Sequence, residues 1–549
     1  MYSPIRAQRS VSSSCQRNLG SCREGPVSFY DSGGASSKTG WSSKRKSSNA
    51  MDTEAPELDM LFLPFLTPGH ILPMVNLARL LAARGVKATI VTTPSNALLC
   101  HSTVDEDTHS GLKIRFHILR LPSSEVGLPQ GIENFYSFNS LEMSQKLYLA
   151  VRMLQQPIEQ LVRELRPQCI VSDMFFPWTS ELGIPRLFFD GMGFFPRCIS
   201  ESLRVFAPHE KVQSDTEPFL VPGLPDYITI TRSQLPDFVN DLKSETAQLL
   251  NQIRESELQS YGVVVNSFYE LEPDYVEHYK KVLGRKAWHV GPVSLVNRKT
   301  TMDKVTREDR HASPSMVDEC LIWLDSMEPK SVLYVCFGSS TFFPETQLDE
   351  IEMGLEASGH PFIWVLKGKE NQERWLPEGI KEIVVEESEE KKTKGLIITG
   401  WAPQVEILNH WAIGGFLTHC GWNSILESVD AAVPMITWPV CSEQFYNEKL
   451  VTQVLRIGIG VDANVWTPFN SDGETRKELV KKGEIEKAVI KLMMMSGGGE
   501  EGKEAKQIRS RARELSDKAK RAMEEDGSSY ADLTALINDL KVVVKQQSF

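Results

Sequence analysis

The chain lacks the features that mark several large protein classes. No apolar run approaches the roughly 18 to 20 residues of a membrane-spanning helix. The nine cysteines are scattered and form no C-x-x-C pair, so neither a disulfide framework nor a zinc site is indicated. No N-x-S/T sequon occurs either. These absences predict a protein of a reducing compartment, and we expect a cytoplasmic location.

An excess of positive charge is also missing. The 72 acidic residues outnumber the 60 basic ones, which gives a net charge of −12. This balance argues against nucleic acid or an anionic membrane as the main partner, and no stable membrane insertion is expected. With 41% hydrophobic and 24% charged residues, the 549-residue chain is typical of a soluble globular protein with two domains.

A dinucleotide-binding glycine pattern is the third absence. The turn after the first predicted strand reads Thr-Pro-Gly-His, and the glycines of Asp190-Gly-Met-Gly193 are followed by Phe-Phe-Pro. Neither segment supplies G-x-G-x-x-G. A dinucleotide-dependent oxidoreductase, the alternative that an α/β fold alone would allow, is therefore disfavoured.

The first fifty residues differ in composition from the rest. They are rich in Ser and Gly and carry eight basic residues against Glu24 and Asp31. This pattern resembles an organelle transit peptide. We favour the simpler interpretation, an extension in front of Met51, and expect residues 1–57 to be disordered.

Strand and helix patterns alternate from Leu58 onward. The first strand is predicted to end at Phe65–Leu66, and an amphipathic helix follows with Pro73 in its first turn. Its apolar face would carry Met74, Leu77, Ala78 and Leu81. Further strands are expected at 88–92, 113–118, 169–172, 186–189 and 262–266.

A second alternation begins at Ser331, after a polar run at 297–315. The charged residues 381–394 are interpreted as an exposed loop, and helices are predicted at 503–525 and 529–544. The fold class is therefore α/β, with two Rossmann-like, doubly wound parallel-sheet domains facing across a cleft. The predicted parts are a domain at 58–293, a linker at 294–318, a domain at 319–525 and a C-terminal helix at 526–549 that packs back toward the first domain.

Polar and aromatic side chains crowd at predicted strand ends between Trp401 and Gln444. The indole of Trp401 could stack on a nucleobase, an interaction worth about 1–3 kcal/mol, or could be an ordinary half-buried aromatic. Asn423 and Ser424 begin a helix whose free amides suit an anion, although Ser424 to Glu427 also fits a capping box. A purely structural βαβ unit does not need this set, which suits a base, a diphosphate and a sugar.

At these residues the chain resembles the plant secondary-product UDP-glycosyltransferases, nucleotide-sugar enzymes of the GT-B fold. The segment begins with Trp401 and ends with Gln444, as the family's signature box does. SDMFFPW, RSQLPDF, HVGPVSL and YVCFGSS resemble the subgroup that glucosylates flavonoids, coumarins and triterpenoid or steroidal acceptors. The resemblance covers Leu58 to the C-terminus.

The resemblance implies a role for each matching residue of a UDP-sugar site. The implied contacts are Trp401, Ala402 and Gln404 for the nucleoside, Glu427 for the ribose, Ser339, His419, Asn423 and Ser424 for the diphosphate, and Trp422, Glu443 and Gln444 for the sugar. A terminal Gln is typical of glucose users. Three positions depart from the family pattern: Ala432 stands where Gly is usual and could strain a turn, Cys441 replaces an aromatic residue, and Glu443 replaces Asp.

His70 and Asp173 match the catalytic pair of the resembled family. His70 follows the first strand, where a helix N-terminus would keep the imidazole neutral and able to accept a proton. Asp173 ends another strand and could bond the second ring nitrogen or, alternatively, cap the next helix. Several residues are missing after Asp173 relative to the family, so the following helix is predicted to be short.

The implied reaction is an inverting O-glucosyl transfer from UDP-glucose to a hydroxyl of a small lipophilic plant metabolite. His70 would be the base, and neither a metal nor another cofactor is expected. The one D-x-D motif, Asp105-Glu-Asp107, is interpreted as part of a solvated loop. Phe175, Phe176, Trp178, Phe194 and Phe195 either line an acceptor pocket or belong to the core. We expect a monomer, and the alternative is a catalytically impaired UDP-sugar-binding protein.

Overall fold

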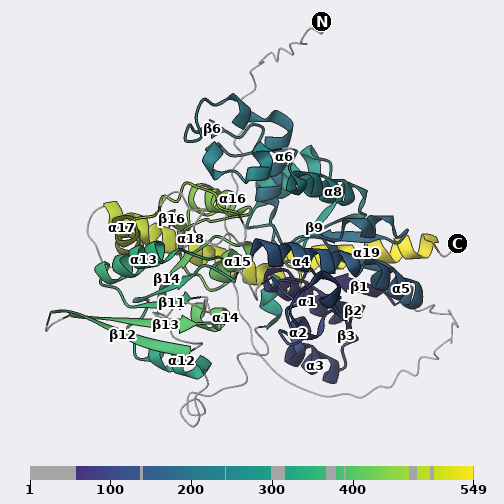
Figure 1. Ribbon diagram of the computed structural model, residues 1–549, viewed down its shortest axis with the longest axis horizontal. Coiled ribbons are helices and arrows are strands. Elements are labelled where there is room, and N and C mark those ends of the chain that lie inside the picture. Colours follow the sequence, from purple (N-terminus) through teal and green to yellow (C-terminus); the bar gives the residue numbers. More distant parts are fainter. Residues whose placement is uncertain are drawn as a thin grey trace, which may run out of the picture. The chain divides into compact units, whose positions relative to one another are not determined.

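The computed structural model describes residues 57–135, 140–241, 243–297, 316–339, 341–366, 379–388, 391–468, 479–494 and 500–547. The predicted N-terminal extension, apart from Glu57, and most of the predicted linker lie outside these residues. Two seven-stranded sheets organise the described part (Figure 1).

The first sheet is entirely parallel and has the order β3-β2-β1-β4-β5-β8-β9. Its strands are β1 (Asp59–Leu63), β2 (Lys87–Thr92), β3 (Ile114–Ile118), β4 (Cys169–Asp173), β5 (Arg186–Phe189), β8 (Gly262–Val265) and β9 (Ala287–His289). The strand order reverses between β1 and β4, where Leu63 pairs with Ser172. A ligand of an open parallel sheet binds beyond the strand ends at such a switch point.

The second sheet has the order β12-β13-β11-β10-β14-β15-β16 and a switch point between β10 and β14, where Cys336 pairs with Thr418. Its strands are β10 (Val332–Cys336), β11 (Phe362–Leu366), β12 (Gly379–Ser388), β13 (Lys391–Thr399), β14 (Ile413–Thr418), β15 (Met435–Thr437) and β16 (Gly458–Gly460). Only the β12–β13 pair is antiparallel among the described strands of this sheet. The two sheets confirm the predicted GT-B class.

Helices alternate with the strands in both halves. In the first half they are α1 (Pro68–Ala82), α2 (Pro94–Ala97), α3 (His101–His109), α4 (Leu141–Met153), α5 (Gln155–Leu165), α6 (Phe194–Phe206), α7 (Asp237–Asn240), α8 (Glu245–Gln259) and α9 (Pro273–Glu277). In the second half they are α12 (Met316–Asp325), α13 (Glu345–Ala357), α14 (Gln404–Leu408), α15 (Trp422–Asp430), α16 (Gln444–Lys449), α17 (Lys482–Met493), α18 (Glu500–Met523) and α19 (Ser528–Gln547). A two-stranded hairpin, β6 (Phe219–Leu220) and β7 (Thr229–Ile230), stands apart from the large sheets.

The predicted apolar face of α1 is buried. Met74, Leu77, Ala78 and Leu81 have no exposed surface and pack with strand residues such as Phe62 and Ile90. Burying an aliphatic side chain of this size contributes about 1.5–3 kcal/mol. This packing fixes α1, which carries His70 as its third residue, on the first sheet.

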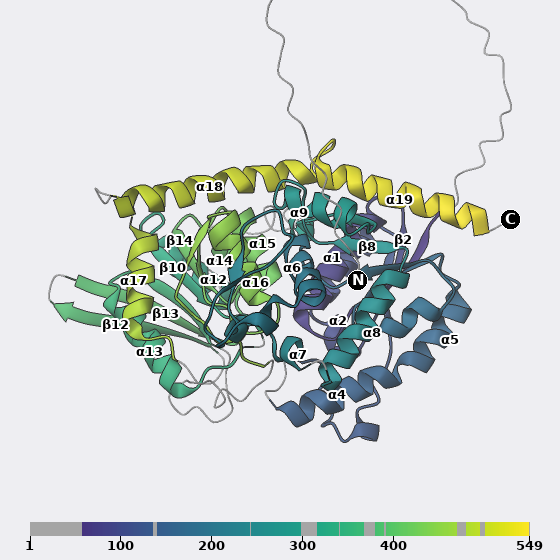
Figure 2. The ribbon, with the colours of Figure 1, turned by 90° about the horizontal axis from the view of Figure 1, so that it is seen from above.

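The two C-terminal helices contact different halves of the structure (Figure 2). The Ser516 hydroxyl of α18 donates to the Asp430 carbonyl at the end of α15, at 2.6 Å. On α19, Asp532 accepts the His289 amide of β9 at 3.0 Å, and the Ser529 hydroxyl donates to the Gly291 carbonyl at 2.6 Å. The last helix therefore returns to the first sheet.

Three local predictions were wrong. Helix α1 begins at Pro68, so Pro73 lies inside it and not in its first turn. Asp105 and Asp107 belong to α3, and Asp107 forms an ion pair with the buried Arg79, which gives the D-x-D segment a structural partner. The charged residues expected as a loop at 381–394 instead contribute residues 381–388 and 391–394 to the antiparallel β12–β13 pair at the edge of the second sheet, where charged residues are common.

None of the described helices is both long enough and apolar enough to cross a membrane.

Candidate active site

The switch point of the first sheet brings His70 and Asp173 together. His70 is the third residue of α1, and Asp173 is the last residue of β4. The Nδ1 atom of His70 lies 2.7 Å from Oδ2 of Asp173, whose side chain is fully buried, while the imidazole is 23% exposed. Asp173 also accepts the Phe175 amide at 3.2 Å, which fixes the carboxylate. With Nδ1 engaged, Nε2 is the atom of His70 that can accept a proton.

The pKa of His70 differs from the neutral-base prediction. Burial lowers this pKa, but the carboxylates of Asp173, Asp190 and Glu443 outweigh burial and raise it above the ordinary histidine value. The predicted helix N-terminus effect is therefore overcome by three acidic groups from two halves of the chain. The charged form of His70, which catalysis would create, is the form that this surrounding favours.

Two phenylalanine rings lie beside the His70 imidazole, and a third stacks on one of them. The Phe65 and Phe175 rings each have their centroid 5.9 Å from that of His70, and they lie 4.2 Å from each other. Phe135 stacks on Phe65 at 5.0 Å. Of the proposed acceptor-site aromatics, Phe194 and Phe195 are completely buried core residues, which leaves Phe175 as the one that contacts the candidate base.

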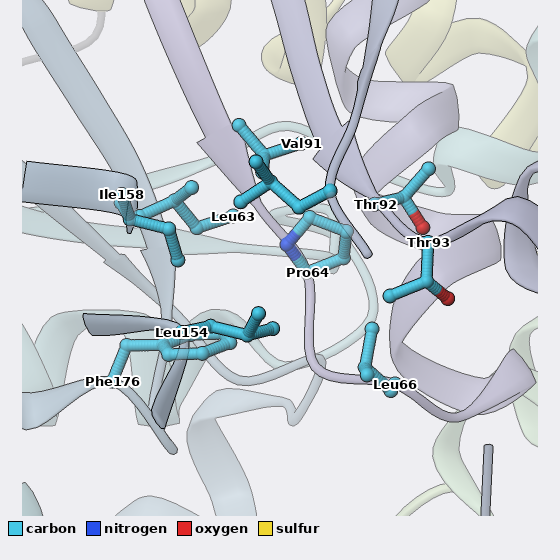
Figure 3. A pocket seen from close by; sticks show the side chains of 10 residues that line it. Leu63, Pro64, Leu66, Val91, Thr92, Thr93, Leu154, Ile158 and Phe176 are labelled. Atoms are coloured by element: carbon cyan, nitrogen blue, oxygen red, sulfur yellow. The ribbon is translucent and has the colours of Figure 1, made fainter. Parts of the chain in front are cut away.

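A small pocket of about 10 Å³, lined mostly by apolar side chains, lies among β1, β2 and α5 (Figure 3). Its lining includes Leu63, Val91, Leu154 and Phe176. A volume of this size corresponds to about one water molecule, so the pocket is too small for an aromatic metabolite. The helix after Asp173 is short, as predicted: it is a single 3-10 helix, Pro177–Glu181.

A proline inside α1 links the two halves of the site. Pro73 has no N–H, so the carbonyl of Gly69, four residues earlier, lacks its usual intrahelical donor. The side-chain amide of Asn423 donates to this Gly69 oxygen at 2.8 Å. The start of α15 is thereby placed one residue away from His70.

His419 directly follows β14, and its ring lies against Gly338 of the loop after β10 and against Gly421 of its own loop. A Cβ atom at Gly338 would lie 2.6 Å from this ring and one at Gly421 would lie 2.4 Å from Nε2, so only glycine fits at both positions. Burial lowers the pKa of His419 to about 4, which keeps it neutral. Among the described residues its Nδ1 atom has no hydrogen-bond partner. Ser339 follows Gly338 and therefore lies in the loop beside this imidazole.

Gln404, Ser424 and Glu427 form one hydrogen-bonded cluster. The Gln404 amide nitrogen donates to Oε2 of Glu427 at 2.6 Å and to the Ser424 hydroxyl at 3.2 Å, and its oxygen accepts from the Tyr334 hydroxyl at 3.3 Å. Burial raises the pKa of Glu427 to about 7. The predicted capping box is wrong, because α15 begins at Trp422 and no described side chain caps it.

Trp401 and Ala402 lie in the loop after β13 and before α14. The Trp401 side chain is 48% exposed, and Ala402 is buried. An indole that keeps half of its surface accessible at a strand end is available for stacking on a flat ligand.

Glu443 and Gln444 begin α16 and have different surroundings. Glu443 accepts from the Asn447 amide at 3.1 Å, and burial, with Asp190 nearby, raises its pKa. Gln444 is buried, and its oxygen accepts the amides of Val440 and Cys441 at 2.9 and 3.0 Å. The Gln444 side chain therefore fixes the backbone just before α16. The Glu443 carboxylate is one of the three that raise the pKa of His70.

The indole of Trp422, a predicted sugar contact, packs against the first half of the chain. Its side chain is buried, and its indole nitrogen donates to the Asn266 carbonyl of the first half at 2.7 Å.

Asp190 and Arg197 are functional candidates that the sequence did not reveal. Asp190 follows β5, accepts the Met192 amide at 3.0 Å, and pairs with the buried Arg197 at 2.5 Å. Arg197 also pairs with Glu257 at 3.1 Å. In the sequence, this segment stands out only as an incomplete G-x-G-x-x-G motif. No local sequence pattern indicates that the Asp190 charge raises the pKa of His70. No cluster of three or more potential metal-ligating side chains occurs within the described ranges.

Two sheets that present a His–Asp pair and a helix N-terminus at their switch points are the arrangement expected of a nucleotide-sugar-dependent transferase of the GT-B class. The comparisons with known proteins agree. A glycosyltransferase N-terminal domain model matches residues 57–295, and a UDP-glucoronosyl and UDP-glucosyl transferase model matches residues 216–495.

Curated plant enzymes match nearly the whole described chain. Scopoletin glucosyltransferase of Nicotiana tabacum is 46% identical over 88% of this chain and 98% of its own length. The UDP-glucose flavonoid 3-O-glucosyltransferase 7 of Fragaria ananassa is 47% identical over 89% and 98%. The crystal structure of Glycyrrhiza uralensis UGT73P12 with glycyrrhetinic acid 3-O-monoglucuronide is similar at a TM-score of 0.78 and 42% identity, covering 90% of this chain and 97% of that one. The chain belongs to the UDP-glycosyltransferase family.

Proposed function

We propose that the chain is a UDP-glucose-dependent, inverting O-glucosyltransferase for a hydroxyl of a small lipophilic plant metabolite. The observation that carries this proposal is the His70–Asp173 pair, held beside the N-terminus of α15 through the Asn423–Gly69 hydrogen bond. A general base and an anion-binding helix start are the two groups that displacement of a diphosphate requires.

The transfer step uses the two halves together. Nε2 of His70 accepts the proton of the acceptor hydroxyl while that oxygen forms a bond to the anomeric carbon. The bond from this carbon to the UDP oxygen breaks, and the electron pair leaves with UDP. Asp173 stabilises the imidazolium through Nδ1, at the 2.7 Å contact.

Negative charge on the departing diphosphate meets donors at the start of α15. The free amides of its first turn, the hydroxyl of Ser424, the amide of Asn423 and a neutral His419 would hold the diphosphate, with Ser339 in the neighbouring loop. These donors support our proposal that no metal or further cofactor is used. Trp401 would stack on uracil with Ala402 beside it, Gln404 would contact the nucleoside, and Glu427 would accept the ribose hydroxyls.

Glucose is the proposed sugar because the signature box ends in Gln444, and the two curated relatives above are named as glucosyltransferases. Glu443 would accept the sugar hydroxyls, while Gln444 would shape the loop that presents it. The Phe65–Phe175 ring pair beside His70 supports a flat apolar acceptor of the flavonoid, coumarin, triterpenoid or steroid class. We further propose that the enzyme is a cytoplasmic monomer.

A transfer assay tests this function. The purified chain is incubated with UDP-glucose and either scopoletin, a flavonol or a steroidal alcohol, and the products are read by mass spectrometry. We expect addition of one hexosyl group, and we expect its loss in His70→Ala. His101→Ala, which changes an exposed histidine of α3, is the matched control. UDP-glucose binding without transfer to any acceptor would instead indicate the impaired binding protein.

A further inference from the structure

Trp422 begins α15 of the second half, but its side chain contacts the first half. The indole is 4% exposed, and its nitrogen donates to the Asn266 carbonyl at 2.7 Å. Asn266 directly follows β8, and its own side-chain oxygen accepts the Val293 amide at 3.0 Å. The hydrogen bond of Trp422 is therefore made to backbone that is fixed within the first half.

The socket for the indole is built around Gly193. A Cβ atom at this position would lie 2.5 Å from Cη2 and Cζ2 of Trp422 and 2.9 Å from Oε1 of Glu272. Only a residue without a side chain allows the indole to sit there. Gly193 also precedes α6, so a shift of its backbone would move the start of that helix.

Buried Glu272 makes the socket rigid. Its two carboxylate oxygens accept the Phe194 and Phe195 amides, the first of α6, at 3.0 and 2.7 Å. The Ser267 hydroxyl donates to the same carboxylate at 2.5 Å. Burial raises the pKa of Glu272, and these donors oppose that rise. The carboxylate thus joins α6 to the segment after β8, the two elements that hold the indole.

The next residue of α15 makes a second contact of the same kind. Asn423 donates to the Gly69 carbonyl at 2.8 Å, an acceptor freed by Pro73. Two consecutive side chains of the second half therefore bond to backbone oxygens of the first half, one beside β8 and one beside His70. Two such points determine how the start of α15 is oriented relative to the base.

We propose that the Trp422 indole, seated in the socket of Gly193, Asn266 and Glu272, is a positioning device that docks the donor-binding half against His70. This inference rests on the proposed function and replaces a sugar contact by the indole with an interdomain role. The indole N–H is used by Asn266, and the ring is enclosed by the socket. The device sets the distance between the attacking hydroxyl and the anomeric carbon, and an error of about 1 Å in such a distance can cost about 100-fold in rate.

The test compares Trp422→Phe with Trp364→Phe. Phe cannot donate the hydrogen bond to Asn266, whereas Trp364 is a buried tryptophan of β11 that packs within the second half. Affinities for UDP and UDP-glucose are measured by calorimetry, and kcat is measured with the acceptor used best by the unmodified enzyme. We expect Trp422→Phe to change both affinities by less than about twofold and to lower kcat about 10- to 100-fold. Trp364→Phe should lower Tm and leave kcat near its original value.

Gly193→Ala, which leaves the Trp422 side chain in place, covers the case in which Trp422→Phe fails to fold, and a double-mutant cycle extends the test. Gly193→Ala places a methyl group where the indole ring lies, so it should lower kcat by itself. In the Trp422→Ala background only the contact with Glu272 remains, and Gly193→Ala should cost less than it does alone. Additive effects in the cycle would overturn the proposal.

Two further outcomes separate the alternatives. An unchanged kcat in Trp422→Phe would refute the docking role. A selective loss of UDP-glucose affinity relative to UDP would show that the indole contacts the sugar. Failure of the unmodified enzyme to transfer glucose would refute the proposed function instead, and docking would then be read from hydrogen exchange of the segment after β8, which should accelerate in Trp422→Phe and not in Trp364→Phe.

Discussion

Asp173→Asn should slow glucosyl transfer and at the same time extend activity to lower pH. The carboxylate is fully buried and lies 2.7 Å from Nδ1 of His70. A hydrogen bond to a charged partner contributes about 1.5–3 kcal/mol, and about 1.4 kcal/mol corresponds to a factor of ten in rate. We therefore expect kcat to fall about 10- to 100-fold from this interaction alone. The amide nitrogen can also donate to Nδ1 and place the ring proton on Nε2, which slows the reaction further.

The direction of the pH shift follows from the charges around His70. Burial lowers its pKa, and Asp173 makes the largest opposing contribution, so the pKa is raised overall. The base must be neutral to accept a proton, and kcat/KM of the unmodified enzyme therefore rises as pH passes this raised pKa. Removing the Asp173 charge lowers the pKa and moves the acid limb of the profile to lower pH, although the plateau falls.

The stability of the pair has the opposite pH dependence. Because the folded-state pKa of His70 is above its unfolded value, the stabilisation is complete below the ordinary histidine pKa and is lost as pH rises through the folded-state pKa.

Steady-state rates across pH for the unmodified enzyme, Asp173→Asn and the exposed control Asp105→Asn test the predicted shift of the acid limb. A limb that stays in place or moves to higher pH in Asp173→Asn would refute the reasoning.

Three other predictions concern stability, donor binding and the acceptor. Ala432 has φ of 58°, so Ala432→Gly should raise the free energy of unfolding by about 1 kcal/mol in a denaturant titration, and a loss of stability would contradict the strain. Burial raises the pKa of Glu427 to about 7, so UDP-glucose should bind more weakly as pH falls below about 7; calorimetry should show a flat profile for Glu427→Gln, and an equal pH dependence in that variant would exclude Glu427 as its source. Phe175→Ala removes a ring beside His70 and should raise the acceptor KM about tenfold with an unchanged affinity for UDP, whereas an unchanged acceptor KM would place the aglycone elsewhere.

Periodicity and strand-end chemistry predicted a large part of the fold. The apolar face of α1 and the position of β5 were confirmed, because the side chains that a buried helix or strand packs into the core are apolar and recur at a regular spacing in the sequence. The His70–Asp173 contact followed from a more general rule, because His70 follows β1 and Asp173 ends β4 at the same edge of a parallel sheet. Their contact was expected; their catalytic role stays a proposal.

The wrong predictions share a physical origin in tertiary context. Pro73 normally favours a helix start, yet here α1 tolerates it because Asn423 satisfies the carbonyl that the proline frees. Ser424 and Glu427 match a capping box, but Gln404 binds both side chains from another helix. The spacing of residues within one segment carries no information about a partner supplied by a distant one.

The charge around His70 was unpredictable for the same reason. Asp190 lies in the first half of the chain and Glu443 in the second, and only the folded structure brings both carboxylates close enough to raise the pKa of His70. The Trp422 indole belongs to the signature segment, so the sequence favoured a sugar contact. Its glycine socket at Gly193 lies far away in the chain and gives no local signal.

The anomeric configuration of the first product tests the central claim most directly. Proton NMR of the glucoside formed from UDP-α-glucose measures the coupling between the first two sugar protons before any equilibration. Direct attack by an acceptor oxygen that His70 deprotonates, on the face opposite UDP, predicts the β-glucoside alone. An α-glucoside would contradict the account, because retention requires a second displacement or attack from the face that UDP occupies.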